Sequence, residues 1–153
     1  MLFRSPGRIP ELLAATAADR AGKVLATDAY ASSALIEYHA RASVAVFGRG
    51  TSHARQADID TDWRSLDGRD FVILRREVPL PQDYAPYFRE IRVREIPLGP
   101  GIYHAVIGEG FRYDAYRDRV LSDIRDRYYR IPRMLPVGRC YFFERYFPGQ
   151  ARP

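Results

Sequence analysis

The chain has 153 residues, close to the commonest size of a single globular domain, so we expect one domain over 1–153. Hydrophobic residues make up 46% of it, which is enough for a packed core and excludes a disordered tail. The net charge of +5 allows contact with anionic groups without identifying a partner. Lys23 is the only lysine. The other basic residues are arginines, which bind phosphate and carboxylate in bidentate fashion. A GC-rich genome, which favours arginine codons over lysine codons, explains the same preference for arginine.

Several kinds of protein are excluded by what the sequence lacks. Cys140 is the single cysteine, so an intramolecular disulfide and a cysteine-based zinc site are both excluded. No stretch approaches the roughly 18 apolar residues of a membrane-spanning helix. The first ten residues lack the apolar core of a signal peptide. We therefore expect the chain alone to be soluble, and a role outside a membrane would need a preceding segment to carry it there.

The first half of the chain predicts a β-α-β unit. Residues 11–21 predict a helix, and two short apolar runs at 24–27 and 43–47 predict buried strands. Between the runs, residues 29–41 carry apolar side chains at helical spacing, with Asp28 as the expected N-cap. The order strand, helix, strand is typical of neighbouring parallel strands.

The middle of the chain predicts loops, one further strand and a hairpin. Residues 48–62 are polar and predict a long loop, followed by a short turn at 63–66. A third strand is expected at 71–75 and a short helix at 82–88. Alternating apolar and charged residues on either side of a Gly-Pro-Gly turn predict a β-hairpin over 90–107.

The last part of the chain predicts one clear helix and an aromatic extension. Residues 113–128 place tyrosines and aliphatic side chains on one helical face and Asp and Arg on the other. The extension at about 131–153 contains the sequence Cys-Tyr-Phe-Phe-Glu-Arg-Tyr-Phe at 140–147. So many rings either cover the domain's own core or meet a partner surface. Altogether the pattern predicts an α/β fold, a three-layer Rossmann-like domain with a mostly parallel sheet, a terminal β-hairpin and flanking helices.

The loop Gly-Arg-Gly-Thr-Ser-His at 48–53 is the first candidate site, because α/β sheets often bind ligands just after a strand. It is not a dinucleotide-binding loop, since His53 stands where the third glycine belongs, and it is not a P-loop. It either needs only the conformational freedom of glycine or binds an anion through Arg49, His53 and Arg55. Asp28, at its strand end, either caps a helix or contacts the same ligand.

Other residue types with catalytic or metal-binding chemistry form no motif. The alternating aspartates of 58–62 fail the calcium-loop pattern, because Trp63 and Arg69 occupy its glycine and glutamate positions. The three histidines are far apart, and there is no Gly-x-Ser-x-Gly elbow. Burial of Cys140 among aromatic neighbours would make its thiol inert. We expect no catalytic residue, no metal ion and no cofactor in this chain.

Three stretches resemble a known family. They are VLATDAYASSALIEYHA at 24–40, VAVFGRGTSHARQADIDTDWRSLDGRD at 44–70 and GIYHAVIGEGF at 101–111. Together they are similar to the soluble C-terminal domain of bacterial membrane glycosyltransferases, a family related to the protein mannosyltransferases and to the aminoarabinose transferases of lipid A. The motifs are loose, and none of them is a catalytic signature.

The resemblance implies a place and a substrate class. In that family the domain follows a multi-helix membrane part and lies on the extracytoplasmic, periplasmic face of the bacterial inner membrane. The donor is a polyprenyl-phosphate sugar, and the catalytic acids lie between membrane helices, so no catalytic residue is carried over to this chain. The candidate ligand-binding residues all lie within the resembling stretches: Asp28, Tyr30, Arg49, His53, Arg55 and Gln56.

Three functions are consistent with the sequence. The leading hypothesis is a non-catalytic accessory domain that positions a lipid-linked sugar or its acceptor beside a membrane-embedded transferase subunit, with weak, salt-sensitive binding of polyprenyl phosphate or anionic lipid. The second is a protein-interaction module that docks onto a membrane subunit or onto a second copy, as a homodimer, through its aromatic tail. The third is a small Rossmann-like enzyme that binds a nucleotide or sugar. Nucleic acid is not expected as a partner, because arginines alternate with acidic residues and form no basic face.

Overall fold

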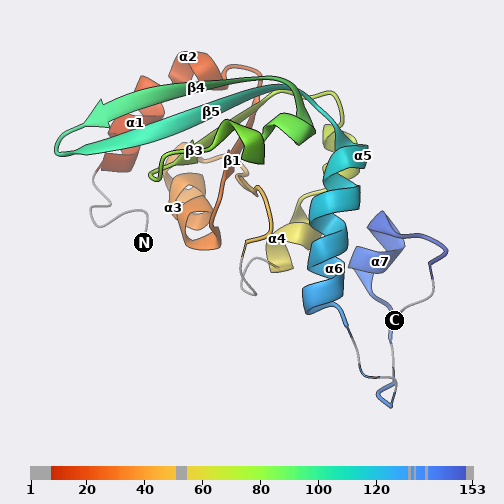
Figure 1. The fold of residues 1–153 in the computed structure, drawn as a ribbon. Coiled ribbons are helices and arrows are strands. Elements are labelled where there is room, and N and C mark those ends of the chain that lie inside the picture. Colours follow the sequence, from red (N-terminus) through yellow and green to blue (C-terminus); the bar gives the residue numbers. More distant parts are fainter. Residues whose placement is uncertain (1–7, 51–54, 131, 133, 137, 151–153) are drawn as a thin grey trace.

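The computed structural model describes residues 8–50, 55–130, 132, 134–136 and 138–150. It is an α/β fold in which helices flank a five-stranded mixed sheet (Figure 1). The strand order is β2-β1-β3-β5-β4. The strands are β1 (Val24–Thr27), β2 (Ala45–Val46), β3 (Phe71–Arg75), β4 (Phe88–Leu98) and β5 (Gly101–Phe111).

The predicted β-α-β unit is confirmed. Helix α3 (Tyr30–Ala40) joins β1 to β2, and β1 pairs in parallel with β2 on one side and β3 on the other. The prediction that Asp28 caps this helix is wrong. The helix begins after Ala29, which makes no side-chain capping bond, while the Asp28 carboxylate lies against Arg75 at the end of β3. An ion pair across the sheet edge replaces the expected local hydrogen bond.

The predicted hairpin is also confirmed, and it is longer at both ends than 90–107. Strands β4 and β5 pair in antiparallel fashion from Phe88 opposite Phe111 to Leu98 opposite Gly101, and β5 continues the sheet by pairing with β3. Gly108 permits a close cross-strand contact, because a Cβ atom there would lie 2.6 Å from the ring of Phe88. The ring of Phe88 covers this point of the sheet.

The predicted helices are present, but their bounds differ. The first helix is divided at Thr16, whose hydroxyl bonds to the carbonyl oxygen of Leu12. Residues 48–62 are not all loop, because 55–60 form a helix. Residues 82–88 form two short 3-10 helices, and 113–128 form one continuous helical rod with a π-helical turn at its centre. The bounds are α1 (Ile9–Ala15), α2 (Ala17–Arg20), α4 (Arg55–Asp60), η3 (Trp63–Leu66), η4 (Pro81–Asp83), η5 (Ala85–Tyr87), α5 (Tyr113–Tyr116), η6 (Arg117–Leu121), α6 (Ser122–Tyr128) and α7 (Tyr141–Tyr146). No helix in the described part of the chain is both long and apolar enough to span a membrane.

Two hydrophobic cores lie on opposite faces of the sheet. The alternation of side chains along β3 sends Phe71 and Ile73 to one core and Val72 and Leu74 to the other. Helices α1 and α3 cover the second core. The first core is dominated by aromatic rings, and it is closed by the α5–α6 rod and by α7. Helices thus cover both faces of the sheet at β1 and β3, while most of the edge strand β4 is exposed.

The aromatic tail packs on the domain's own core. Phe142, Phe143 and Tyr146 of α7 are all buried. The ring of Phe142 stacks on Tyr129 with 4.1 Å between ring centroids. The Tyr146 hydroxyl donates to the carbonyl oxygen of Thr61 at 2.6 Å. The aromatic segment was expected either to cover the domain's own core or to meet a partner surface. These three rings cover the core, so they are not part of an exposed docking surface.

Replacement of Phe142 by Ala tests the contribution of α7 to the fold. Removing a fully buried ring leaves a cavity, so F142A should lower the free energy of unfolding by about 3–5 kcal/mol. The neighbouring Tyr141→Ala is the matched control, because Tyr141 is exposed and its loss should change stability by only about 0.5 kcal/mol. Urea denaturation measures both values, and equal effects of the two substitutions would show that α7 does not belong to the core.

Candidate functional site

The candidate site is a cavity of about 490 Å³ at the carboxyl ends of the three parallel strands. The chain leaves β1 toward β2 and then crosses to β3 on the other side of β1, so the sheet has its topological switch point here. Open α/β sheets bind ligands at such points. The cavity is lined by Asp28, Phe47, Gly48, Arg49, Gly50, Arg75, Gln82, Asp83, Tyr84, Pro86, Tyr87, Arg119 and Val120.

An ion pair between Asp28 and Arg75 links the ends of β1 and β3 at this cavity. The Asp28 Oδ2 atom lies 3.6 Å from Nε of Arg75, and Nη1 of Arg75 donates to the Tyr84 hydroxyl at 2.6 Å. Burial raises the pKa of the Asp28 carboxyl, and Arg75 acts against this rise. The Oδ1 atom of Asp28 is buried and has no hydrogen-bond partner among the described residues, while the side chain as a whole is 25% exposed.

The glycine loop after β2 supplies a second wall. Gly48 and Gly50 have φ angles of 89° and 58°, a region that favours glycine, so the loop does need the freedom of this residue. The Gly48 N–H donates to the Tyr116 hydroxyl at 2.9 Å, which ties the loop to α5. Nε of Arg49 lies 2.9 Å from Oδ2 of Asp123 on α6, and the Arg49 side chain remains mostly exposed. The loop is therefore held open with a guanidinium at its rim.

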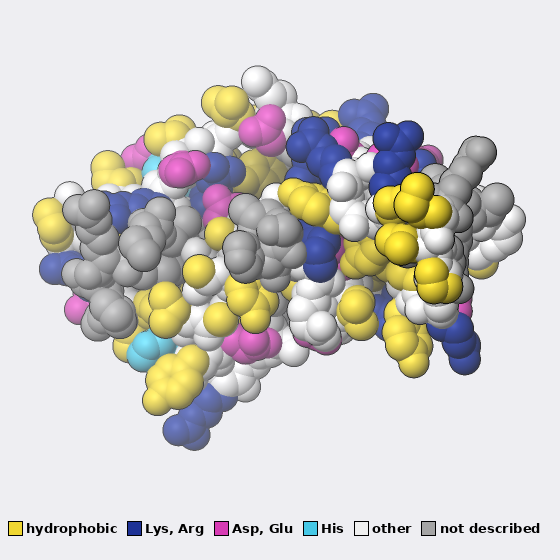
Figure 2. Space-filling model, turned by 90° about the horizontal axis from the view of Figure 1, so that it is seen from below, with side chains coloured by type: hydrophobic (Ala, Val, Ile, Leu, Met, Phe, Trp, Pro, Cys, Tyr) yellow, Lys and Arg dark blue, Asp and Glu magenta, His cyan; other side chains and the backbone are white. Residues whose placement is uncertain are grey.

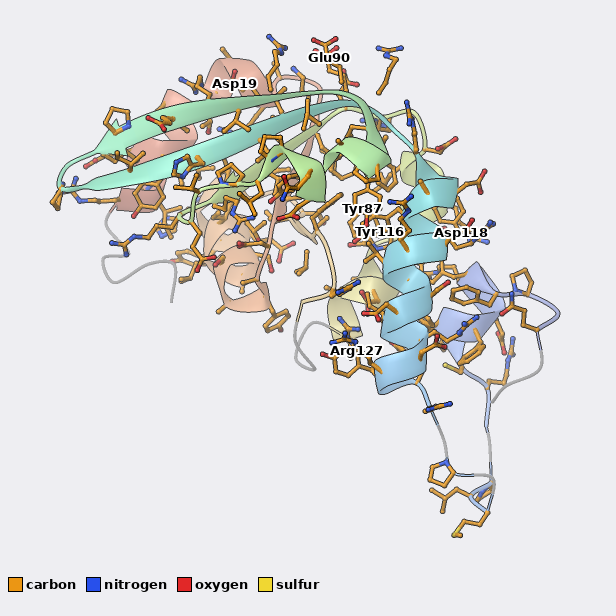
Figure 3. The ribbon with its side chains drawn as sticks, viewed as in Figure 1. Asp19, Tyr87, Glu90, Tyr116, Asp118 and Arg127 are labelled. Atoms are coloured by element: carbon orange, nitrogen blue, oxygen red, sulfur yellow. The ribbon has the colours of Figure 1, made fainter. Side chains whose placement is uncertain are left out.

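The α5–α6 rod and η5 supply the third wall. Arg119 lies in the π-helical turn η6, and π turns within α-helices are frequent at functional sites. It makes no ion pair within the described residues. Burial raises the pKa of Tyr87, while Arg119 and Arg49 lower it, so both arginines act on the same phenol. Figure 3 shows Tyr87 and Tyr116 together between η5 and the rod, and their rings meet edge to face.

The chemistry of this cavity is that of a polar, anion-binding site. Three guanidinium groups, from Arg49, Arg75 and Arg119, line the cavity together with two carboxylates, from Asp28 and Asp83, and two tyrosines add apolar faces. Arg75 is paired with Asp28 and Glu77, and Arg49 is paired with Asp123, whereas Arg119 is exposed and makes no ion pair among the described residues, so it is the cation best placed to pair with a phosphate. No group of three metal-binding side chains occurs among the described residues. The arrangement can bind and orient a small phosphorylated molecule.

The structure brings two of the six candidate residues from the sequence, Asp28 and Arg49, into this cavity. Tyr30 lies elsewhere, on a smaller hollow of about 260 Å³ beside α3 and α4. That hollow is also lined by Glu37 and Asp60, so it would repel an anion.

The other three candidates do not line the cavity as described. Nη2 of Arg55 donates to the carbonyl oxygen of Arg49, its Nε lies 3.2 Å from Asp58, and its guanidinium lies over the Tyr128 ring. Gln56 is exposed and bonds to Asp60 on the same helix. His53 lies outside the described residues. Arg55 therefore supports the glycine loop from behind, and Arg49 alone of the two faces the cavity.

Sequence reasoning missed four residues of the site: Arg75, Tyr84, Tyr87 and Arg119. Arg75 could have been found from the sequence, because it ends a predicted buried strand. Ligands of α/β sheets bind at the ends of such strands, which is the reason for selecting Asp28. The other three come from segments that only the tertiary fold brings to the sheet edge.

Asp58, which lies behind the glycine loop, makes the stability of the fold depend on pH. Burial raises the pKa of its carboxyl to about 7 from the usual 3.8, although Arg55 acts to lower it. Between pH 3.8 and about 7, Asp58 is therefore protonated in the folded state and ionised in the unfolded state. Its contribution to stability is complete below pH 4 and is lost as the pH rises through 7, by roughly 4 kcal/mol in total.

Replacement of Asp58 by Asn should remove this contribution. The free energy of unfolding of the native protein should fall between pH 4 and pH 7, and D58N should show a clearly shallower fall because Asn does not titrate. Asp60→Asn is the control, since Asp60 is exposed on the same helix and should leave the slope unchanged. Denaturation at a series of pH values measures the slopes, and an unchanged slope in D58N would exclude Asp58 as its source.

Comparisons with family models, with curated proteins and with solved structures find no match to this chain.

Proposed function

We propose that this chain is a non-catalytic accessory domain that binds a phosphorylated sugar and positions a lipid-linked donor or acceptor beside a membrane-embedded transferase. The cavity at the carboxyl edge of the sheet carries the proposal. The guanidinium of Arg119, with that of Arg49 at the rim, suits a phosphate, and the partly exposed Asp28 carboxylate suits a sugar hydroxyl. The cavity is large enough for a sugar phosphate and lies within the common range for small-molecule sites.

A Rossmann-like architecture is part of the same proposal. Helices on both faces of the sheet, the 2-1-3 order of the parallel strands and a cavity at the β1/β3 switch point all support it. The resemblance of 24–40, 44–70 and 101–111 to membrane glycosyltransferases supplies the transferase partner, the polyprenyl-phosphate donor and the periplasmic location. Each of these belongs to the proposal.

A binding role fits this cavity better than catalysis does. Asp28 is paired with Arg75, whose charge favours the ionised carboxylate, so this group is suited to accept a hydrogen bond from a ligand hydroxyl. The two tyrosines have pKa values raised by burial, which keeps them protonated at neutral pH. The site can therefore recognise charge and hydroxyl groups without supplying a nucleophile.

The proposal predicts a salt-sensitive affinity for sugar phosphates that depends on Arg119. Calorimetric titration of the whole chain with glucose 1-phosphate should show binding, and R119A should weaken it about tenfold or more, because a charge-assisted hydrogen bond is lost. Arg49→Ala should act in the same direction.

Arg89→Ala is the matched control, because Arg89 is an exposed arginine on β4 and does not line the cavity. It should bind glucose 1-phosphate as the native chain does. Farnesyl phosphate and inorganic phosphate, titrated in parallel, separate recognition of the prenyl chain from recognition of the phosphate. Absence of binding to all three ligands, or equal losses in R119A and R89A, would refute the proposed function.

A further inference from the structure

The segment between α6 and α7 forms a projecting tip with exposed apolar side chains. In Figure 1 the chain runs away from the body of the domain after α6 and returns to it at α7. A backbone hydrogen bond from Leu135 N–H to the carbonyl oxygen of Pro132 closes a turn at this tip. Met134 is 89% exposed and Leu135 is 51% exposed. A projecting turn that presents two large apolar side chains to water is a candidate surface for a partner.

The charged residues of the tip itself are arginines, and acidic residues flank it at Asp126 and Glu144. Residues 127–143 contain four arginines and no aspartate or glutamate. Arg130 is exposed and makes no ion pair among the described residues. Arg127 and Arg139 are paired near the base of the tip with Asp123 and Glu144. Viewed from below, hydrophobic side chains gather on the surface nearest the viewer, beside side chains of Lys and Arg (Figure 2).

Tyrosines lie near the base of the same projection. Tyr141 is 64% exposed, and Tyr128 is also exposed at the end of α6. Tyrosine is favoured where an apolar phase meets water, because its ring is apolar and its hydroxyl is polar. The projection thus has apolar side chains at its tip and arginines and tyrosines behind them. A lipid surface has the same order, with acyl chains inside and polar head groups outside.

We infer that the tip around Met134 and Leu135 inserts into the surface of an anionic lipid bilayer. The apolar side chains would enter the acyl boundary while the arginines contact the phosphate groups of the lipids. A second copy of this chain fits the tip less well. A short turn is far smaller than the roughly 800 Å² per partner of a stable protein interface. The inference rests on the tip alone and holds whatever the cavity binds.

Flotation of the whole chain with lipid vesicles tests the inference. The native chain should float with vesicles of phosphatidylcholine that contain phosphatidylglycerol as a minor component, and much less with phosphatidylcholine alone. The double substitution of Met134 and Leu135 by Ser should reduce binding at least tenfold, because the inserted apolar area is lost. Arg130→Ala should reduce it about fivefold, which is the usual contribution of one arginine near an anionic surface.

Matched controls come from exposed residues elsewhere. The double substitution of Val78 and Leu80 by Ser removes exposed apolar side chains before η4, and Arg89→Ala removes an exposed arginine on β4. Both should float as the native chain does. Failure of the native chain to float, or equal binding by the tip variant, would overturn the inference. A native dimer that the tip substitutions convert to a monomer would also overturn it, in favour of a second copy as partner.

A fluorescent reporter gives a second readout that does not depend on loss of binding. Trp63 is the only tryptophan and is buried, so its emission should not respond to vesicles. In L135W the new indole should shift its emission to shorter wavelength when anionic vesicles are added. An unshifted spectrum with vesicle-bound protein would show that another surface makes the contact. Binding of glucose 1-phosphate should be the same in the tip variants, which separates this inference from the function of the cavity.

Discussion

The ring of Phe47 stands at the centre of the packing on which the candidate site depends. Phe47 follows β2 directly, and its centroid lies 5.8 Å from that of Tyr84, 5.9 Å from that of Tyr87 and 5.0 Å from that of Tyr116. Each such pair adds about 0.5–1.5 kcal/mol beyond simple burial. The Tyr116 hydroxyl then accepts from the N–H of Gly48. One aromatic cluster thus fixes the glycine loop, the short helices before β4 and the start of the α5–α6 rod relative to the sheet, so the walls of the cavity are preorganised.

The β-α-β unit and the hairpin could be predicted from the sequence because their patterns are local, whereas the sheet, expected to be mostly parallel, is mixed because β5 pairs in antiparallel fashion with β3 and β4. Short apolar runs separated by a helix, and alternation on both sides of a Gly-Pro-Gly turn, have few other physical solutions. Helix α4 could not be predicted, because its stability comes from far along the chain. The Tyr146 hydroxyl contacts the carbonyl oxygens of Asp58 and Thr61, and Arg145 bonds to the carbonyl oxygen of Ile59. A polar stretch read alone carries no sign of these contacts.

The candidate site could be predicted only where strand ends define it. Asp28 and Arg49 follow β1 and β2, and the same rule extends to Arg75 at the end of β3. Arg55 was expected beside Arg49, yet the helix that begins there turns its guanidinium toward the buried Asp58. Arg119 could not be found from the sequence, because its place depends on the π-helical turn within a rod that the sequence presents as uniform. Tertiary packing, more than local pattern, decides which arginines face the cavity.

The central claim is that the carboxyl edge of the sheet binds a phosphorylated sugar. A crystal structure of the chain with glucose 1-phosphate tests it most directly. The account predicts the phosphate between Arg49 and Arg119, with a sugar hydroxyl donating to the carboxylate of Asp28. An empty cavity, or a ligand seated in the hollow beside Tyr30, would contradict it.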